Sequence, residues 1–299
     1  MKKIGKEQVR KARQTLAKYK EGKAVLDKRI VSNEQWWKLR HWGEIGYDKD
    51  DTRPMPASAW LFNSLANKHA DAMDNIPEPA VLPREKSDEE VAKQLSLILP
   101  AILERCDYEK LYSDGWWYKL KNGSMCTAVV WDPDADGGMG DIAIRNADIL
   151  NLFWEPGIKD IEESANLFYV TLVDRERLNL MYPELCGEEP ESVAGGTGNV
   201  EKYKTEDKTD DSAKVEVVDW YYKKTINGRK QLCYCKFCGD RVIYSSEDDE
   251  SCADGFYKHS RYPFVMDTLF VQEGTPCGFG YIDVMRDAQM YICLLYTSP

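Results

Sequence analysis

The chain has 299 residues, 43% hydrophobic and 30% charged, with a formal net charge of −11. This size fits one large or two ordinary globular domains, and the acidic balance argues against a protein that coats nucleic acid through overall positive charge. The longest dense apolar stretch, 95–103, is far shorter than the ~18–20 residues that cross a bilayer, so we expect no membrane segment. No apolar run follows the basic start, so we expect no secretory signal and interpret the nine scattered cysteines as reduced thiols.

The first forty residues differ in charge from the rest of the chain. Met1–Arg40 holds thirteen Lys or Arg and four Asp or Glu, a net charge of +9. Apolar residues at helical spacing predict a helix with one apolar stripe, formed by Val9, Ala12, Leu16 and Tyr19. Gly22 is expected to interrupt this helix. The basic residues are interpreted either as a solvated helix face or as an arm that contacts nucleic acid or an acidic neighbouring subunit.

Further helices are expected before residue 105. Ser32–Gln35 has the form of a capping box, so a second short helix is predicted to begin there. The segment Trp60–Ile76 is expected to be a helix that ends before a pair of prolines. Ser87 and Glu90 form another capping box, which predicts a helix that continues through Pro100 to residue 103.

From residue 125 the pattern is typical of strands. Cys126–Trp131 and Asp141–Arg145 predict a hairpin around an acidic turn. Leu167–Val173 suits a buried strand, and a short helix is expected over 175–185. Cys186–Lys214 is polar and predicts a flexible insert that proteases cut first. The remaining expected elements are a three-stranded meander and one further strand, followed by a helix: Val215–Lys224, Gln231–Phe237, Arg241–Tyr244, Tyr262–Val271 and Asp283–Ile292.

Two segments resemble metal sites without completing one. Asp132, Asp134, Asp136 and Gly137 match the first half of a calcium loop, but the twelfth position is Ala143 where the loop needs a bidentate Glu. We interpret the segment as an acidic hairpin turn. The second segment is a cysteine cluster with zinc-like spacing, made of Cys233, Cys235, Cys238 and Cys252.

The cysteine cluster has two interpretations. Only Cys235 and Cys238 have the spacing of a zinc knuckle, and Cys252 has no second cysteine beside it, although His259 follows. Cys233 and Cys235 alternate by two, which favours one face of a half-buried strand. We expect a structural strand; the alternative is a zinc-containing nucleic-acid-binding protein that uses this cluster and the basic arm.

No active site emerges from the residues alone. His69 is expected at the edge of a core, and His41 has no acidic partner in a motif. The glycines of 195–198 lie in the polar insert without the flanking strand and helix of a phosphate-binding loop. Nucleotide-binding, serine-hydrolase and zinc-protease motifs are absent from the sequence. An unrecognised hydrolase with scattered carboxylates is the remaining alternative.

Four segments in order resemble a tailed-bacteriophage portal protein. They are Trp60–Glu85, Trp131–Pro156, Tyr182–Leu185 and Gly278–Ile292. Their co-linear order, over a stretch from about Trp36 to Ile292, carries the resemblance.

The resemblance implies a structural protein of the virion. Portal proteins form a dodecameric ring at one capsid vertex, assembled in the host bacterial cytoplasm. The terminase large subunit pumps double-stranded DNA through the tunnel of this ring, and the DNA leaves the same way at infection. The ring also contacts capsid and scaffolding proteins and carries the head–tail adaptor. The resemblance implies no enzymatic activity, no cofactor, no metal, no catalytic residue and no membrane partner.

The fold that we expect is α+β, with N-terminal helices, a mainly antiparallel β region that corresponds to the portal wing, and the start of a stem helix. We expect the chain to divide into a basic helical arm (1–50), the helices and hairpin of the wing (51–185), a polar insert (186–214), the wing meander (215–275), the stem start (276–292) and a foreign tail (293–299). Portals continue well past the last of these helices. We therefore expect a truncated chain without the clip and most of the stem, which forms no stable ring alone.

Overall fold

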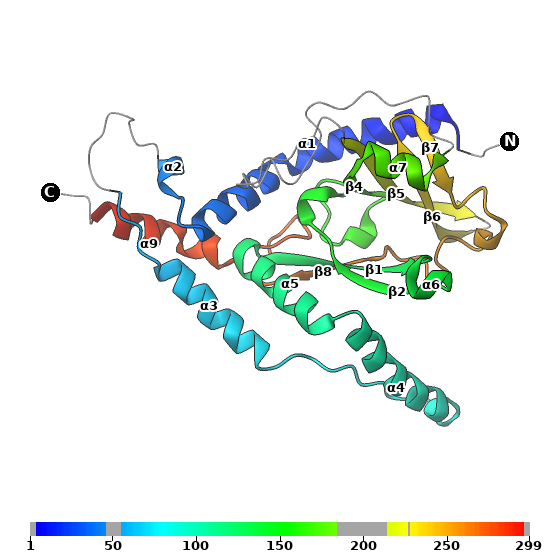
Figure 1. Cartoon of the computed structure of the whole chain (residues 1–299), viewed down its shortest axis with the longest axis horizontal. Helices are drawn as coiled ribbons and strands as arrows, with labels where there is room; N and C mark the ends of the chain where they lie inside the picture. Colours follow the sequence, from blue (N-terminus) through cyan, green and yellow to red (C-terminus); the bar gives the residue numbers. More distant parts are fainter. Residues whose placement is uncertain (1–3, 46–54, 184–213, 227, 296–299) are drawn as a thin grey trace. The chain divides into compact units, whose positions relative to one another are not determined.

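The computed structural model describes residues 4–45, 55–183, 214–226 and 228–295 (Figure 1). The chain forms two compact units, each made of segments that are distant in the sequence. Unit 1 consists of Met1–Val31, Asp148–Tyr262 and Glu273–Pro276, and unit 2 consists of Ser32–Ala147, Pro263–Gln272 and Cys277–Pro299. N-terminal helices, antiparallel sheets and a C-terminal helix confirm the α+β class. The division into arm, wing, insert and stem start stays a prediction.

Unit 1 contains a five-stranded antiparallel sheet with the strands in sequence order. The strands are β3 (Leu152–Phe153), β4 (Asn166–Asp174), β5 (Lys214–Ile226), β6 (Arg229–Cys238) and β7 (Arg241–Ser245). The predicted buried strand and the predicted meander are both confirmed. The single-turn helices that the structure describes beside the sheet are η2 (Ile149–Asn151), η3 (Ile161–Glu163) and η6 (Glu250–Cys252).

Helix α1 (Lys6–Trp37) is continuous, which corrects two expectations. Gly22 does not interrupt it, and Ser32 lies inside it rather than at the start of a second helix. A Cβ atom on Gly22 would lie 2.5 Å from Cγ of Pro156, so the missing side chain allows close packing here. A single glycine costs a helix only about 1 kcal/mol, which the packing of the apolar stripe offsets.

Apolar residues cover both faces of the five-stranded sheet. The predicted stripe of α1, with Val9 and Leu16, packs in one cluster with Phe168 and Phe237. Helix α7 (Arg175–Met181), shorter than the expected 175–185, contributes Leu178 to a second cluster. Val217 belongs to this second cluster and its neighbour Val218 to the first, as the alternation along β5 requires.

A buried lysine joins α1 to the start of the sheet. The Nζ atom of Lys23 donates hydrogen bonds of 2.6 Å and 2.7 Å to the carbonyl oxygens of Ile149 and Leu152. It lies 3.3 Å from Oδ1 of Asp27 and 4.1 Å from the ring centre of Phe153. The charge is therefore compensated by a carboxylate, two carbonyls and an aromatic face, as a buried cation requires.

Unit 2 combines helices with a three-stranded sheet of order β2-β1-β8. The strands are β1 (Ser124–Asp132), β2 (Asp141–Asn146) and β8 (Phe264–Thr268). The predicted hairpin is confirmed, with the short turn of helix α6 (Ala135–Gly138) at its tip. The further strand expected over 262–271 is shorter and pairs with β1, not with the meander.

The apolar core of unit 2 is formed by α3 (Trp60–Met73), α5 (Tyr108–Asn122) and α9 (Tyr281–Leu295) together with the end of α1. The unit also contains α2 (Trp42–Ile45) and α4 (Glu89–Arg105), with the single turn η1 (Lys86–Asp88) before α4. The core cluster consists of Trp36, Leu61, Leu65, Leu120 and Ile282.

Two details of these helices correct the sequence reading. The capping box before α4 is formed by Glu85 and Asp88, not by Ser87 and Glu90. The amide N–H of Glu85 donates to Oδ2 of Asp88 at 3.3 Å. Helix α5 was not predicted, while Pro100 lies inside α4 as expected. The helix expected over 60–76 is confirmed as α3, with its end at Met73.

Tight backbone packing joins α5 to the start of α9. A Cβ atom on Gly280 would lie 2.6 Å and 2.7 Å from the carbonyl oxygens of Lys121 and Leu120. Gly123, with φ of +87°, ends α5 in the left-handed conformation that favours glycine. The glycines of the 278–280 segment are therefore required by the close approach of two main chains.

Several predictions concern residues outside the described part of the chain. The polar insert Cys186–Lys214 lies there except for Lys214, which begins β5, and so does the glycine-rich segment 195–198. Of the expected tail 293–299, residues 293–295 continue α9 and the rest lie outside. Among the described residues, no helix is both long and apolar enough to cross a membrane.

Candidate functional site

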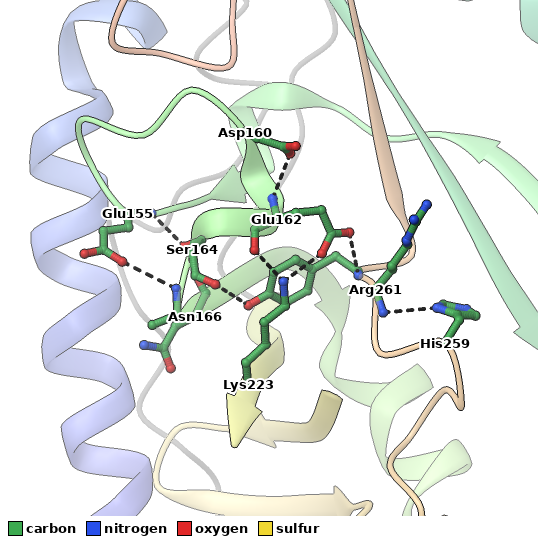
Figure 2. Close-up of polar contacts among 10 residues, drawn as sticks. Glu155, Asp160, Glu162, Ser164, Asn166, Lys223, His259 and Arg261 are labelled. Atoms are coloured by element: carbon green, nitrogen blue, oxygen red, sulfur yellow. Dashed lines mark hydrogen bonds and ion pairs between the residues drawn. The ribbon is translucent and has the colours of Figure 1, made fainter. Parts of the chain in front are cut away.

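A connected set of polar contacts in unit 1 includes Tyr262, and we call it the polar clamp (Figure 2). Its members come from the segment 155–166, from Lys223 on β5 and from the segment 259–262. Tyr262 and Ser164 are buried, and Lys223 and Glu162 are partly buried. The clamp lies where the chain leaves unit 1 for the segment that begins at Pro263.

Glu162 and Lys223 form the charged half of the polar clamp. Nζ of Lys223 donates to the main-chain oxygen of Glu162 at 2.5 Å and to its Oε2 atom at 2.7 Å. The other carboxylate oxygen of Glu162 accepts the amide N–H of Tyr262 at 3.0 Å. The ammonium group also lies 4.3 Å from the ring centre of Tyr262. Asp160 caps the turn by accepting the amide N–H of Glu162 at 2.9 Å.

Ser164 connects the other half of the polar clamp. The hydroxyl of Tyr262 donates to the carbonyl oxygen of Ser164 at 2.7 Å. Oγ of Ser164 donates to the carbonyl oxygen of Asn166 at 2.5 Å and accepts the amide N–H of Glu155 at 3.0 Å. A carboxylate oxygen of Glu155 in turn accepts the amide N–H of Ala165 at 3.4 Å. Donors and acceptors from three chain segments are thus paired with one another.

The chemistry of the polar clamp is structural. Burial, and after it the charge of Glu162, raises the pKa of the Tyr262 phenol above its ordinary value, so the hydroxyl stays protonated as a donor. The ammonium group of Lys223 is held between a carbonyl, a carboxylate and a ring. Such an arrangement fixes the path of the chain and offers no group poised to react with a substrate.

Replacing Tyr262 by Phe is expected to lower the free energy of unfolding by about 1–3 kcal/mol, because the buried carbonyl of Ser164 loses its donor. Urea unfolding followed by circular dichroism measures the loss. Tyr291→Phe is the matched control, since Tyr291 is 67% exposed and its change should be neutral. Equal stabilities of the two variants would show that the hydrogen bond contributes nothing.

The structure separates the cysteines of the proposed zinc cluster. Cys233 and Cys235 belong to the same core cluster as Phe237, whereas Cys238 belongs to the cluster with Leu178 on the opposite face of β6. Cys235 and Cys238, which have the knuckle spacing, therefore point away from each other, and the zinc alternative is not supported. In the described part of the chain, no group of three or more His, Cys, Asp or Glu side chains is placed to hold a metal ion.

Burial keeps the β6 thiols protonated. It raises the pKa of Cys235 to about 12 and that of Cys238 to about 11, and nearby carboxylates add to both shifts. Thiolates are the reactive form, so these side chains are inert in the folded protein.

A thiol reagent is expected to label Cys106 and Cys252, which are half-buried, before Cys235 and Cys238. The two buried thiols should react only as fast as the protein unfolds. Mass spectrometry of digests after timed labelling measures the order. Adding a chelator should change neither the order nor the melting temperature, and a chelator-dependent exposure of Cys235 would contradict the structural role.

The acidic turn and the histidines make local contacts. Asp132 pairs with Arg145 across the hairpin, and one of its carboxylate oxygens accepts the amide N–H of Asp134 at 3.2 Å. His69 stacks on Trp117 with ring centres 3.9 Å apart, which places it at a core edge as expected. His41 is fully buried, with Nε2 3.2 Å from Sγ of Cys293.

Several basic residues of α1 pair with acidic residues of their own unit. Arg13 donates to Oδ1 of Asp240 at 2.8 Å, and Arg10 lies 3.6 Å from the same carboxylate. This hydrogen bond from Arg13 lowers the pKa of Asp240 below its ordinary value. Lys20 pairs with Glu216 at 3.2 Å. The N-terminal part of α1 is thus docked through its apolar stripe and these ion pairs, rather than projecting as a free arm.

Comparison with known proteins supports the resemblance found in the sequence. The model of a protein family described as phage P22-like portal protein matches residues 70–292, which is most of the chain. A search among curated proteins found no match. The matched range includes the hairpin of unit 2, the five-stranded sheet of unit 1 and nearly all of α9. The chain therefore belongs to the phage P22-like portal protein family.

Proposed function

We propose that the chain is a subunit of the portal ring at the unique capsid vertex, through which terminase packages double-stranded DNA and through which the DNA leaves at infection. The observation that carries this proposal is the family match over residues 70–292. The family is structural, and it implies a component of the phage capsid that forms an oligomeric ring.

Two features of the chain support a passive conduit. The net charge of −11 disfavours tight binding to the phosphate backbone, so DNA can slide past. The polar clamp pairs its own donors and acceptors, as suits a structural part of the protein. Terminase, the head–tail adaptor and the capsid and scaffolding proteins are the partners of this proposal, and twelve is its number of subunits.

Deleting the gene from the phage tests the proposal. We expect lysates that contain capsid shells but no DNA-filled heads, because without the ring DNA has no entrance. Supplying the wild-type gene in trans should restore filled heads. Electron microscopy and nuclease-protected DNA measure both outcomes. DNA-filled heads in the absence of the gene would overturn the proposed function.

A further inference from the structure

An exposed apolar stripe lies along α4. Val91, Leu95 and Ile98 follow helical spacing and are between 40% and 55% exposed. The only residue of α4 that is buried is Ala92. We call Val91, Leu95 and Ile98 the α4 ridge. A helix of a globular protein normally turns such a stripe toward a core, so a stripe left in water marks a contact surface.

A second exposed apolar surface lies on the three-stranded sheet of the same unit. Val129, Trp131, Ile142 and Val265 are between 38% and 58% exposed, and we call them the sheet patch. These residues share one face of the sheet. Thr127, Val129 and Trp131 alternate by two along β1, and paired residues of neighbouring strands lie on the same face. Trp131 pairs with Ile142, and Thr127 pairs with Val265.

Helix α5 covers only one end of this face. Lys119 of α5 donates to the carboxylate oxygens of Asp267 at 2.8 Å, and Asp267 pairs with Met125. The sheet patch lies toward the other end of β1. Beside it is a hollow of about 310 Å³ whose apolar lining includes Ile142, Ala143 and Ile144.

We propose that the α4 ridge of one subunit packs on the sheet patch of the next copy of this chain. The inference rests on the proposed function, because a ring of more than two identical subunits requires contacts between two different surfaces. An isologous pairing of one surface with itself would stop at a dimer. The chain carries both surfaces in one unit, which lets every copy offer a ridge to one neighbour and a patch to the other.

The test uses one charged substitution on each surface. Ile98→Glu on the ridge and Val129→Glu on the patch should each weaken self-association by at least about 30-fold, as central apolar residues of an interface do. Val265→Glu is a second patch variant in case Val129→Glu does not fold. Leu97→Glu is the matched control, since Leu97 lies on another side of α4 and is 78% exposed. It should associate like the wild type.

Mixing the variants distinguishes a head-to-tail contact from other contacts. The Val129→Glu subunit keeps its ridge and the Ile98→Glu subunit keeps its patch, so an equimolar mixture should give heterodimers that cannot grow. Analytical ultracentrifugation measures the species, and thermal melts show that each variant is folded.

Three results would overturn the inference: an Ile98→Glu variant that assembles like the wild type, a mixture that contains only monomers, or a wild-type chain that stays monomeric at every concentration. The last would mean that another protein covers these surfaces. The count of DNA-filled heads tests the proposed function separately, so the two proposals can fail independently.

Discussion

Lys23→Met is expected to lower the free energy of unfolding of unit 1 by about 3–5 kcal/mol, as removing one partner from a buried charged cluster does. The variant keeps the aliphatic volume but removes the donor that the carbonyls of Ile149 and Leu152 share. It also removes the cation beside Asp27. Because these groups are inside the protein, water does not replace the lost contacts.

Urea unfolding followed by circular dichroism measures this loss. Lys18→Met is the matched control on the same helix, because Lys18 is exposed and surface changes usually stay within about 0.5 kcal/mol. Hydrogen exchange should be faster at the start of the five-stranded sheet in Lys23→Met alone. Indistinguishable unfolding curves for the two variants would mean that Lys23 does not hold α1 to the sheet.

Gly280→Ala is expected to destabilise unit 2 by about 3 kcal/mol or more, which is the upper range for overpacking. The new methyl group would meet the carbonyl oxygens of Lys121 and Leu120 and the amide nitrogen of Gly123, the last at 2.8 Å. All three are main-chain atoms, so no side-chain rotation relieves the contact. The end of α5 or the start of α9 has to move instead.

Gly43→Ala is the control for this change. Gly43 lies in α2, and a Cβ atom there has nothing within 4 Å, so alanine should be neutral or slightly stabilising. Differential scanning calorimetry compares the two variants with the wild type. A melting temperature of Gly280→Ala equal to that of Gly43→Ala would show that the main chains separate at little cost.

Sequence patterns predicted the sheets better than the helices. In 215–244 and in the hairpin, apolar and polar residues alternate between turn residues. This signal is local, and the strands that it predicted are present. The continuity of α1 through Gly22 depends on contacts with residues more than a hundred positions away, which no local pattern reports. Helix α5 was missed because aromatic and polar residues alternate in it without one clear apolar stripe.

The polar clamp was beyond prediction for the same reason. Its hydrogen bonds join Glu162 to Lys223 and to Tyr262, residues separated by 61 and 100 positions, and each residue type is ordinary at its place. The sequence did not indicate that Lys23 is buried either, because Lys23 is one of many lysines in a basic helix and such lysines are usually exposed to solvent. The family resemblance was predictable because it rests on the order of segments, not on contacts.

The hidden thiols of β6 have a consequence for the lifetime of the particle. A capsid component meets molecular oxygen once it leaves the reducing cell, and free cysteines are then open to irreversible oxidation. Cys235 and Cys238 escape this because burial keeps them protonated and out of contact with oxidants. The vulnerable period is synthesis, when the same side chains are uncovered. Refolding in air should therefore need a reductant to protect these two thiols, while storage of the folded protein in air should leave them reduced.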